Sequence, residues 1–86
     1  MSTRLYVSNL PLSATAEMLI GRFGKFGNVV SVALEPTARA NRRGAFVEMT
    51  TSTGAQQAIA GLNLSDFDGR LVSVYLALGS VPRKLS

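Results

Sequence analysis

Hydrophobic and polar residues alternate along four stretches of the chain, and this period of two predicts four β-strands. The four stretches are residues 4–10, 29–35, 42–49 and 71–78. In the first stretch, Leu5 and Val7 share one face of the strand, while Tyr6 points to the other face. In the third stretch, Phe46 is likewise out of phase with its aliphatic neighbours. Two large aromatic rings are therefore expected on a sheet face that should be exposed to water.

Two further segments have apolar residues three and four positions apart, which predicts two helices. The first helix is expected to begin at the N-cap Thr15 and to end at Gly27-Asn28. The second is expected to be capped by Ser52 or Thr53. The apolar stripe of the first helix consists of Leu19, Phe23 and Phe26. The stripe of the second consists of Ala55, Ala58, Ile59 and Leu62.

The order of these elements predicts an α+β fold. A β-α-β-β-α-β chain with right-handed crossovers forms a ferredoxin-like sandwich, with a four-stranded antiparallel sheet in the order 4-1-3-2 and two helices on one face. Residues 63–69 are expected to be a turn-rich connection that contains Asp68-Gly69. The open face would carry Tyr6, Phe46 and Tyr75. We expect the domain to cover residues 1–78, followed by a short basic C-terminal tail at 79–86.

The composition excludes several classes of protein. The chain has 86 residues, of which 47% are hydrophobic, so it can form one small domain with a real core. It has no cysteine and no histidine, which excludes disulfides, thiolate and imidazole metal sites, and triads that depend on these side chains. We therefore expect no enzymatic activity, no cofactor and no metal. No segment resembles a signal peptide or reaches transmembrane length, so we expect a cytoplasmic protein without a membrane partner.

The charge balance favours a nucleic-acid partner. The chain has a net charge of +4 and an isoelectric point near 10.4, in the range typical of nucleic-acid-binding domains. Three of its cations, Arg39, Arg42 and Arg43, lie within five residues. The two glutamates of the open face either accept hydrogen bonds from base amines or reduce nonspecific affinity. The candidate phosphate or base contacts are Arg42, Arg39, Arg43, Arg4, Arg83, Lys84, Glu35 and Glu48.

Two of the strands carry motifs that resemble those of the RNA recognition motif family. The six-residue motif is Leu5 to Leu10, and the eight-residue motif is Arg42 to Met49. The family pattern of the second motif is basic, Gly, aromatic, Gly or Ala, Phe, Val, any residue, aromatic. Matching positions are Arg42, Ala45, Phe46 and Val47, and departing positions are Arg43, Gly44 and Met49. The resemblance covers roughly residues 4–78, and it is closest to small single-domain RNA-binding proteins of bacteria.

The resemblance implies that Tyr6 and Phe46 stack on two bases of single-stranded RNA. The third aromatic of the pattern, which contacts sugars, is replaced by Gly44, where we expect a close backbone approach or a strand irregularity. The phase of the last strand adds Tyr75 as a further stacking candidate. Single-stranded DNA is a secondary ligand, because stacking does not depend on the sugar.

Two other interpretations of the same fold remain. One is a protein–protein interaction module, whose binding would depend little on salt, whereas phosphate binding weakens steeply as salt rises. The other is a small hydrolase, but the sequence shows no pair of nucleophile and base.

Overall fold

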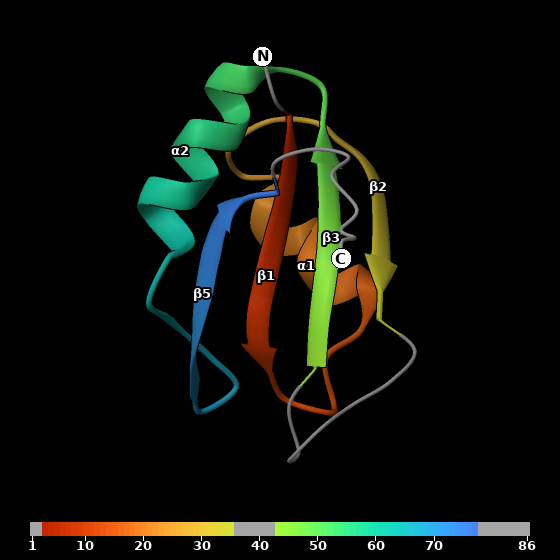
Figure 1. The fold of residues 1–86 in the computed structure, drawn as a ribbon, viewed down its shortest axis with the longest axis vertical. Helices are drawn as coiled ribbons and strands as arrows, with labels where there is room; N and C mark the ends of the chain where they lie inside the picture. Colours follow the sequence, from red (N-terminus) through yellow and green to blue (C-terminus); the bar gives the residue numbers. More distant parts are fainter. Residues whose placement is uncertain (1–2, 36–42, 78–86) are drawn as a thin grey trace, which may run out of the picture.

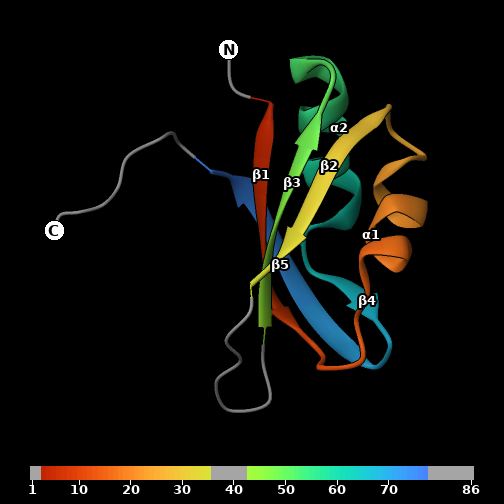
Figure 2. The ribbon, with the colours of Figure 1, turned by 90° about the vertical axis from the view of Figure 1, so that its right-hand side faces the viewer.

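The computed structural model describes residues 3–35 and 43–77, which form one sheet and two helices (Figure 1). Along the chain, the elements are β1 (Arg4–Leu10), α1 (Ala16–Phe23), β2 (Val29–Leu34), β3 (Arg43–Met49), α2 (Ser52–Leu62), β4 (Ser65–Phe67) and β5 (Arg70–Leu76). Figure 2 shows the sheet from its edge, with both helices on the same side of it. The predicted ferredoxin-like α+β fold with both helices on one face is confirmed.

The sheet has five antiparallel strands in the order β2-β3-β1-β5-β4. The prediction of four strands in the order 4-1-3-2 is therefore wrong in the number of strands and in the complete order. The four long strands do have the expected neighbours, and β4 extends the sheet beyond β5. The two central strands, β1 and β3, come from the two motifs found in the sequence.

Strand β4 lies within the segment that the sequence predicts as a turn-rich connection. It has only three residues, which is too short for a readable alternation of apolar and polar positions. It forms because Asp68 and Gly69 both have positive φ, 57° and 89°, as a two-residue hairpin turn requires. This turn brings Phe67 opposite Arg70, and β4 then pairs with β5.

Both helices begin at threonine caps. Thr15 Oγ1 accepts a hydrogen bond from the backbone N–H of Met18 at 3.2 Å, which confirms the first predicted cap. Helix α2 is capped by Thr51, whose Oγ1 accepts from the N–H of Gly54 at 3.0 Å. The prediction of Ser52 or Thr53 as this cap is wrong by one or two positions, because the side chain with the open backbone donor in reach belongs to Thr51.

Helix α1 ends at Phe23 and not at the predicted Gly27-Asn28. After Phe23 the backbone tightens: Lys25 N–H donates to the Arg22 carbonyl at 3.4 Å and Phe26 N–H donates to the Phe23 carbonyl at 3.0 Å. Phe26 still packs against the core, as its spacing predicted. The apolar spacing therefore correctly identified a side chain that packs against the core, and placed the end of the helix too late.

The core lies between the sheet and the two helices. It is built from the inward residues of the strands and the apolar stripes of the helices, with Leu5, Val7, Leu19, Phe23, Val47, Met49, Phe67, Val72 and Val74 among its members. Ala55 and Ala58 of α2 are fully buried, and their small side chains let the helix approach the sheet. With one face of every central strand committed to this core, the alternating residues must lie on the open face.

Candidate nucleic-acid interface

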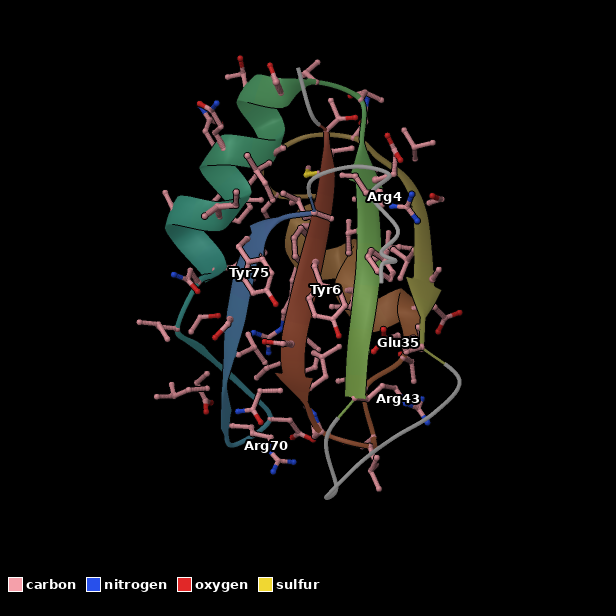
Figure 3. All side chains as sticks on the ribbon, in the orientation of Figure 1. Arg4, Tyr6, Glu35, Arg43, Arg70 and Tyr75 are labelled. Atoms are coloured by element: carbon pink, nitrogen blue, oxygen red, sulfur yellow. The ribbon has the colours of Figure 1, made fainter. Side chains whose placement is uncertain are left out.

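Three aromatic rings form a row across the open face of the sheet. The strand register places Tyr6 of β1 opposite Phe46 of β3 on one side and opposite Tyr75 of β5 on the other. The ring centroids of Tyr6 and Phe46 are 4.9 Å apart, and those of Tyr6 and Tyr75 are 5.6 Å apart. Figure 3 shows Tyr6 and Tyr75 on the side of the sheet opposite to the helices. The structure therefore brings together all three predicted stacking residues.

The rings of this row are tilted with respect to one another. Tyr6 meets Phe46 nearly edge to face, at an interplanar angle of 61°, and is tilted by 43° from Tyr75. Edge-to-face contact at such distances is a favourable arrangement for aromatic pairs. Tyr75 is 50% exposed, and Tyr6 and Phe46 are half-buried. Nucleic-acid bases can stack on aromatic groups presented in this way.

Tyr6 is fixed at its hydroxyl end by Glu35. The hydroxyl donates a hydrogen bond to Glu35 Oε1 at 2.9 Å. Burial of the ring, followed by this hydrogen bond and the charges of Glu35 and Tyr75, raises the pKa of Tyr6 to about 12. Glu35 itself is held to β3, because its backbone N–H donates to the Gly44 carbonyl at 2.9 Å. The sequence placed Glu35 on this face through its phase, but nothing in the sequence linked it to Tyr6.

Gly44 lies directly under the Tyr6–Glu35 pair. A Cβ at this position would lie 2.6 Å from Tyr6 Cζ and 2.5 Å from Glu35 Oε1, and closer still to the Tyr6 hydroxyl oxygen. Gly44 is buried although it belongs to the open face, because the Tyr6 side chain covers it. Of the two alternatives expected at this glycine, the structure shows a close approach, and the approaching group is the hydroxyl end of the Tyr6 side chain.

Arg4 and Glu48 lie on the same face, two positions along their strands from Tyr6 and Phe46. Their Cα atoms are partners across β1 and β3. The Arg4 guanidinium carbon lies over the Phe46 ring, 4.8 Å from its centroid, and the Arg4 side chain is exposed. Glu48 accepts a hydrogen bond from Thr3 Oγ1 at 2.8 Å. Arg4, one of the predicted phosphate or base contacts, therefore contacts an aromatic ring of the row.

One further predicted basic residue, Arg43, does not join this face. Arg43 is opposite Leu10 in the register and is one position out of phase with Gly44, Phe46 and Glu48. Its Nε is buried and has no hydrogen-bond partner among the residues that the structure describes. Four further predicted contacts, Arg39, Arg42, Arg83 and Lys84, lie outside the described residues.

Two serines beside the row were not among the predicted contacts. Ser8 of β1 and Ser73 of β5 are partners in the register, two positions from Tyr6 and Tyr75. The same alternation that identified the tyrosines could have identified these hydroxyl groups, which can both donate and accept hydrogen bonds.

The sequence model of the RNA recognition motif matches residues 5–73, which include all of β1 but its first residue, both helices and most of the sheet. The chain belongs to the RNA recognition motif family. It is 38% identical over 69 residues to a polyadenylate-binding protein, cytoplasmic and nuclear, of Chaetomium globosum, covering 79% of this chain and 9% of that protein. Another relative is organelle RRM domain-containing protein 6, chloroplastic, of Arabidopsis thaliana, 36% identical over 74 residues, 84% of this chain and 41% of that protein.

Solved structures of the family have the same fold. A Sex-lethal protein–RNA complex superposes with a TM-score of 0.76 at 37% identity, over 87% of this chain and 47% of that one. This RNA recognition motif spans less than half of the length of the curated relatives that it matches. Those relatives come from fungi, animals and a plant, so they do not support the expected likeness to bacterial proteins.

Two kinds of structural feature are absent from residues 3–35 and 43–77. No helix in these segments is long and apolar enough to cross a membrane. No group of three or more acidic, cysteine or histidine side chains is arranged there to hold a metal ion.

Proposed function

We propose that the open face of this RNA recognition motif binds single-stranded RNA, with Tyr6 and Phe46 stacking on two bases and Tyr75 extending the surface. The observation that carries this proposal is the cross-strand row of three rings, with centroid separations of 4.9 and 5.6 Å. Stacking of one base on an aromatic side chain contributes roughly 1–3 kcal/mol. The 37% identity to a protein solved in complex with RNA supports the same ligand.

The basic residues would supply the contacts to phosphate. Arg4 is placed for this role, because its guanidinium lies on the aromatic row and its side chain is exposed. We assign the same role to Arg39, Arg42, Arg83 and Lys84 on the basis of their charge, and not to Arg43, which is out of phase with the open face. Glu48 would be an acceptor for base amines, whereas Glu35 already accepts a hydrogen bond from the Tyr6 hydroxyl. We also propose that residues 1–78 form the binding domain and that a basic tail follows it. The protein would act in RNA metabolism in the cytoplasm, without a catalytic step, cofactor or metal.

The test is a titration of labelled, randomised single-stranded RNA, followed by fluorescence anisotropy at two salt concentrations. The Tyr6→Ala/Phe46→Ala double variant should bind at least about tenfold more weakly than the wild type, because two stacking surfaces are lost. Wild-type affinity should fall with salt by a slope near −0.7 for each neutralised phosphate. A Glu17→Ala/Lys25→Ala double variant on the helix side is the matched control, because both residues are exposed there.

Each result has a defined meaning. Loss of binding in the aromatic variant alone, with an unchanged melting curve, supports the stacking surface. Equal binding by both variants would assign the affinity to the basic residues and overturn the stacking roles. Absence of wild-type binding at low salt would overturn the proposal that RNA is the ligand. A titration with single-stranded DNA of the same length tests whether DNA is a secondary ligand.

A protein partner is the second candidate, and exposed apolar side chains favour it. Leu12, Ile20, Leu64 and Leu71 are 48%, 47%, 64% and 58% exposed. Such residues can contact an apolar partner. A complex formed through them would depend little on salt, so the two-salt titration also separates this candidate from RNA binding.

A further inference from the structure

Tyr6 reaches from β1 across the neighbouring strand β3. Its ring covers the backbone of Gly44, and its hydroxyl donates to Glu35 Oε1 at 2.9 Å (Figure 3). Glu35 directly follows β2, so the hydrogen bond connects side chains from the first and second long strands of the chain over a residue of the third. The ring is therefore held at both ends, by β1 through its own backbone and by Glu35 through its hydroxyl.

The space above Gly44 is filled by this pair. In the pattern of the eight-residue motif, the position of Gly44 is aromatic. Here even a Cβ would lie 2.6 Å from Tyr6 Cζ, a distance that requires the ring to move. The Tyr6 ring and an aromatic side chain at position 44 cannot occupy the same area of the sheet.

We propose that Glu35 is a positioning residue of the RNA-binding face, which holds the Tyr6 ring over Gly44 in the orientation that stacks on a base. The proposal rests on RNA binding by the open face. Without the hydrogen bond, the Tyr6 side chain regains rotational freedom, which must be lost again when a base stacks on it. Glu35 thus increases affinity through Tyr6 rather than through its charge.

Electrostatics alone predicts the opposite effect of Glu35. A carboxylate on an RNA-binding face repels phosphates, so its removal should strengthen binding. Positioning requires that Glu35→Ala weakens binding in spite of the lost negative charge. Glu35→Gln keeps an oxygen that can accept from the Tyr6 hydroxyl and also removes the charge. Positioning and electrostatic repulsion therefore predict opposite changes in the RNA affinity of Glu35→Ala.

The first experiment compares RNA affinities of Glu35→Ala, Glu35→Gln and Glu17→Ala. The last removes the same charge from an exposed position of α1, on the opposite side of the sheet. We expect Glu35→Ala to bind about fivefold more weakly than the wild type, which corresponds to one modest hydrogen bond. Glu35→Gln should bind at least as tightly as the wild type, and Glu17→Ala should be unchanged. Tighter binding by both Glu35 variants would overturn the proposal.

A double-mutant cycle tests whether Glu35 acts through Tyr6. Tyr6→Phe keeps the ring and removes the hydroxyl, so it should lose about as much affinity as Glu35→Ala. Combining the two changes should cost no more than either alone, because both remove the same hydrogen bond. Additive losses would mean that Glu35 contacts RNA directly and would contradict the positioning role.

The second experiment restores the aromatic residue of the family pattern. Gly44→Phe should weaken RNA binding roughly fivefold or more, because the new side chain displaces Tyr6 from its hydrogen bond. Gly44→Ala should act in the same direction. The control is Gly21→Ala in α1, where an added Cβ meets nothing within 4 Å. Tighter binding by Gly44→Phe would contradict the proposal, because it would show that an aromatic residue fits beside Tyr6.

A measurement without RNA separates this proposal from the RNA ligand itself. The chain has two tyrosines and no tryptophan, so Tyr75→Phe leaves Tyr6 as the single phenol. In that background, rapid-mixing absorbance should show a lower Tyr6 pKa after Glu35→Ala, because the hydrogen bond and the charge that oppose ionisation are lost. An unchanged Tyr6 pKa would show that the Tyr6–Glu35 hydrogen bond does not form in solution, and would overturn the proposal. A lowered pKa in a protein that binds no RNA would refute only the RNA ligand.

Discussion

Arg4 has a direct contact with one of the rings that we propose to stack on RNA. Its guanidinium carbon is 4.8 Å from the Phe46 centroid, and its backbone lies in β1 opposite Glu48. A guanidinium is planar, so it can stay on the ring and add a second flat surface, or turn toward a phosphate. Both actions favour RNA binding, whereas a residue that merely blocks the ring would oppose it.

We therefore predict that Arg4→Ala weakens RNA binding and reduces the salt slope by about 0.7, the value for one phosphate on a single strand. Arg4→Lys should keep the slope and lose part of the affinity, because an ammonium group has no flat surface. Anisotropy titrations at several salt concentrations measure both quantities, with Lys25→Ala as a control on the helix side. If Arg4→Ala binds RNA more tightly, Arg4 covers the ring and competes with the base.

Tyr6 also predicts a pH dependence of stability. Its pKa is raised from 10.0 to about 12 in the folded protein, first by burial and then by Glu35. The folded state therefore holds this proton more tightly than the unfolded chain does. The resulting contribution to the free energy of unfolding is fully present below pH 10.0 and is lost as the pH rises toward about 12.

Urea unfolding of the wild type and Tyr6→Phe across this range measures the effect. The difference in free energy of unfolding between the two proteins should shrink between pH 10.0 and about 12, since only the wild type has the titrating group. The other ionisable side chains are the same in both proteins, so their contribution cancels. A constant difference across the range would mean that the Tyr6 proton is not held more tightly in the folded state.

At the scale of elements, the β4–β5 hairpin forms one edge of the sheet, and its strand β4 contacts α1. Arg22 of α1 donates from Nη1 to the Asp66 carbonyl at 2.9 Å, and its guanidinium carbon is 4.2 Å from the Phe67 centroid. Phe67 itself is buried in the core. A strand of three residues thus connects a helix to the edge of the sheet, and its existence depends on the turn at Asp68-Gly69.

Gly69→Ala should destabilise the protein by about 1 kcal/mol, because an alanine at a φ of 89° is strained. No atom lies within 4 Å of the added Cβ, so the cost comes from the backbone alone. The control Gly21→Ala lies within a helix, where the same chemical change should be stabilising. Urea unfolding with unchanged m-values measures both. Equal effects of the two substitutions would show that the turn conformation does not matter.

At the scale of the whole molecule, the sheet has its core residues on one face and its proposed RNA-binding residues on the other. Every residue of the buried core among the described segments lies between Leu5 and Val74, on the helix side of the sheet. The aromatic row and Arg4 lie on the other side. Substitutions on the open face can therefore change affinity with little effect on the core.

A chain shortened after residue 78 tests this separation together with the proposed domain limits. Its free energy of unfolding in urea should stay within about 0.5 kcal/mol of the wild type, because all core residues of the described segments are kept. Its loss of RNA affinity relative to the wild type should be larger at low salt than at high salt, because Arg83 and Lys84 are removed. The salt slope should decrease by up to about 1.4 for two phosphates. A large loss of stability would move the domain boundary into the tail.

The local pattern of the sequence determined most of the fold. Alternation and helical spacing identified four strands, two helices and the outward phase of Tyr6, Phe46 and Tyr75, because these signals depend only on neighbouring positions. Strand β4 and the cap at Thr51 could not be found in this way. The strand exists through two positive φ angles and pairing with β5, and the choice among three adjacent hydroxyl residues depends on backbone geometry.

The site shows the same division. The sequence by itself determined which residue types face the open side, since a period of two assigns each residue of a strand to a face. Only the tertiary structure decided that Tyr6 donates to Glu35, that Gly44 lies beneath this pair and that the Arg4 guanidinium contacts the Phe46 ring. Tyr6 and Glu35 are 29 positions apart, and they meet only because β1 and β2 lie on either side of β3.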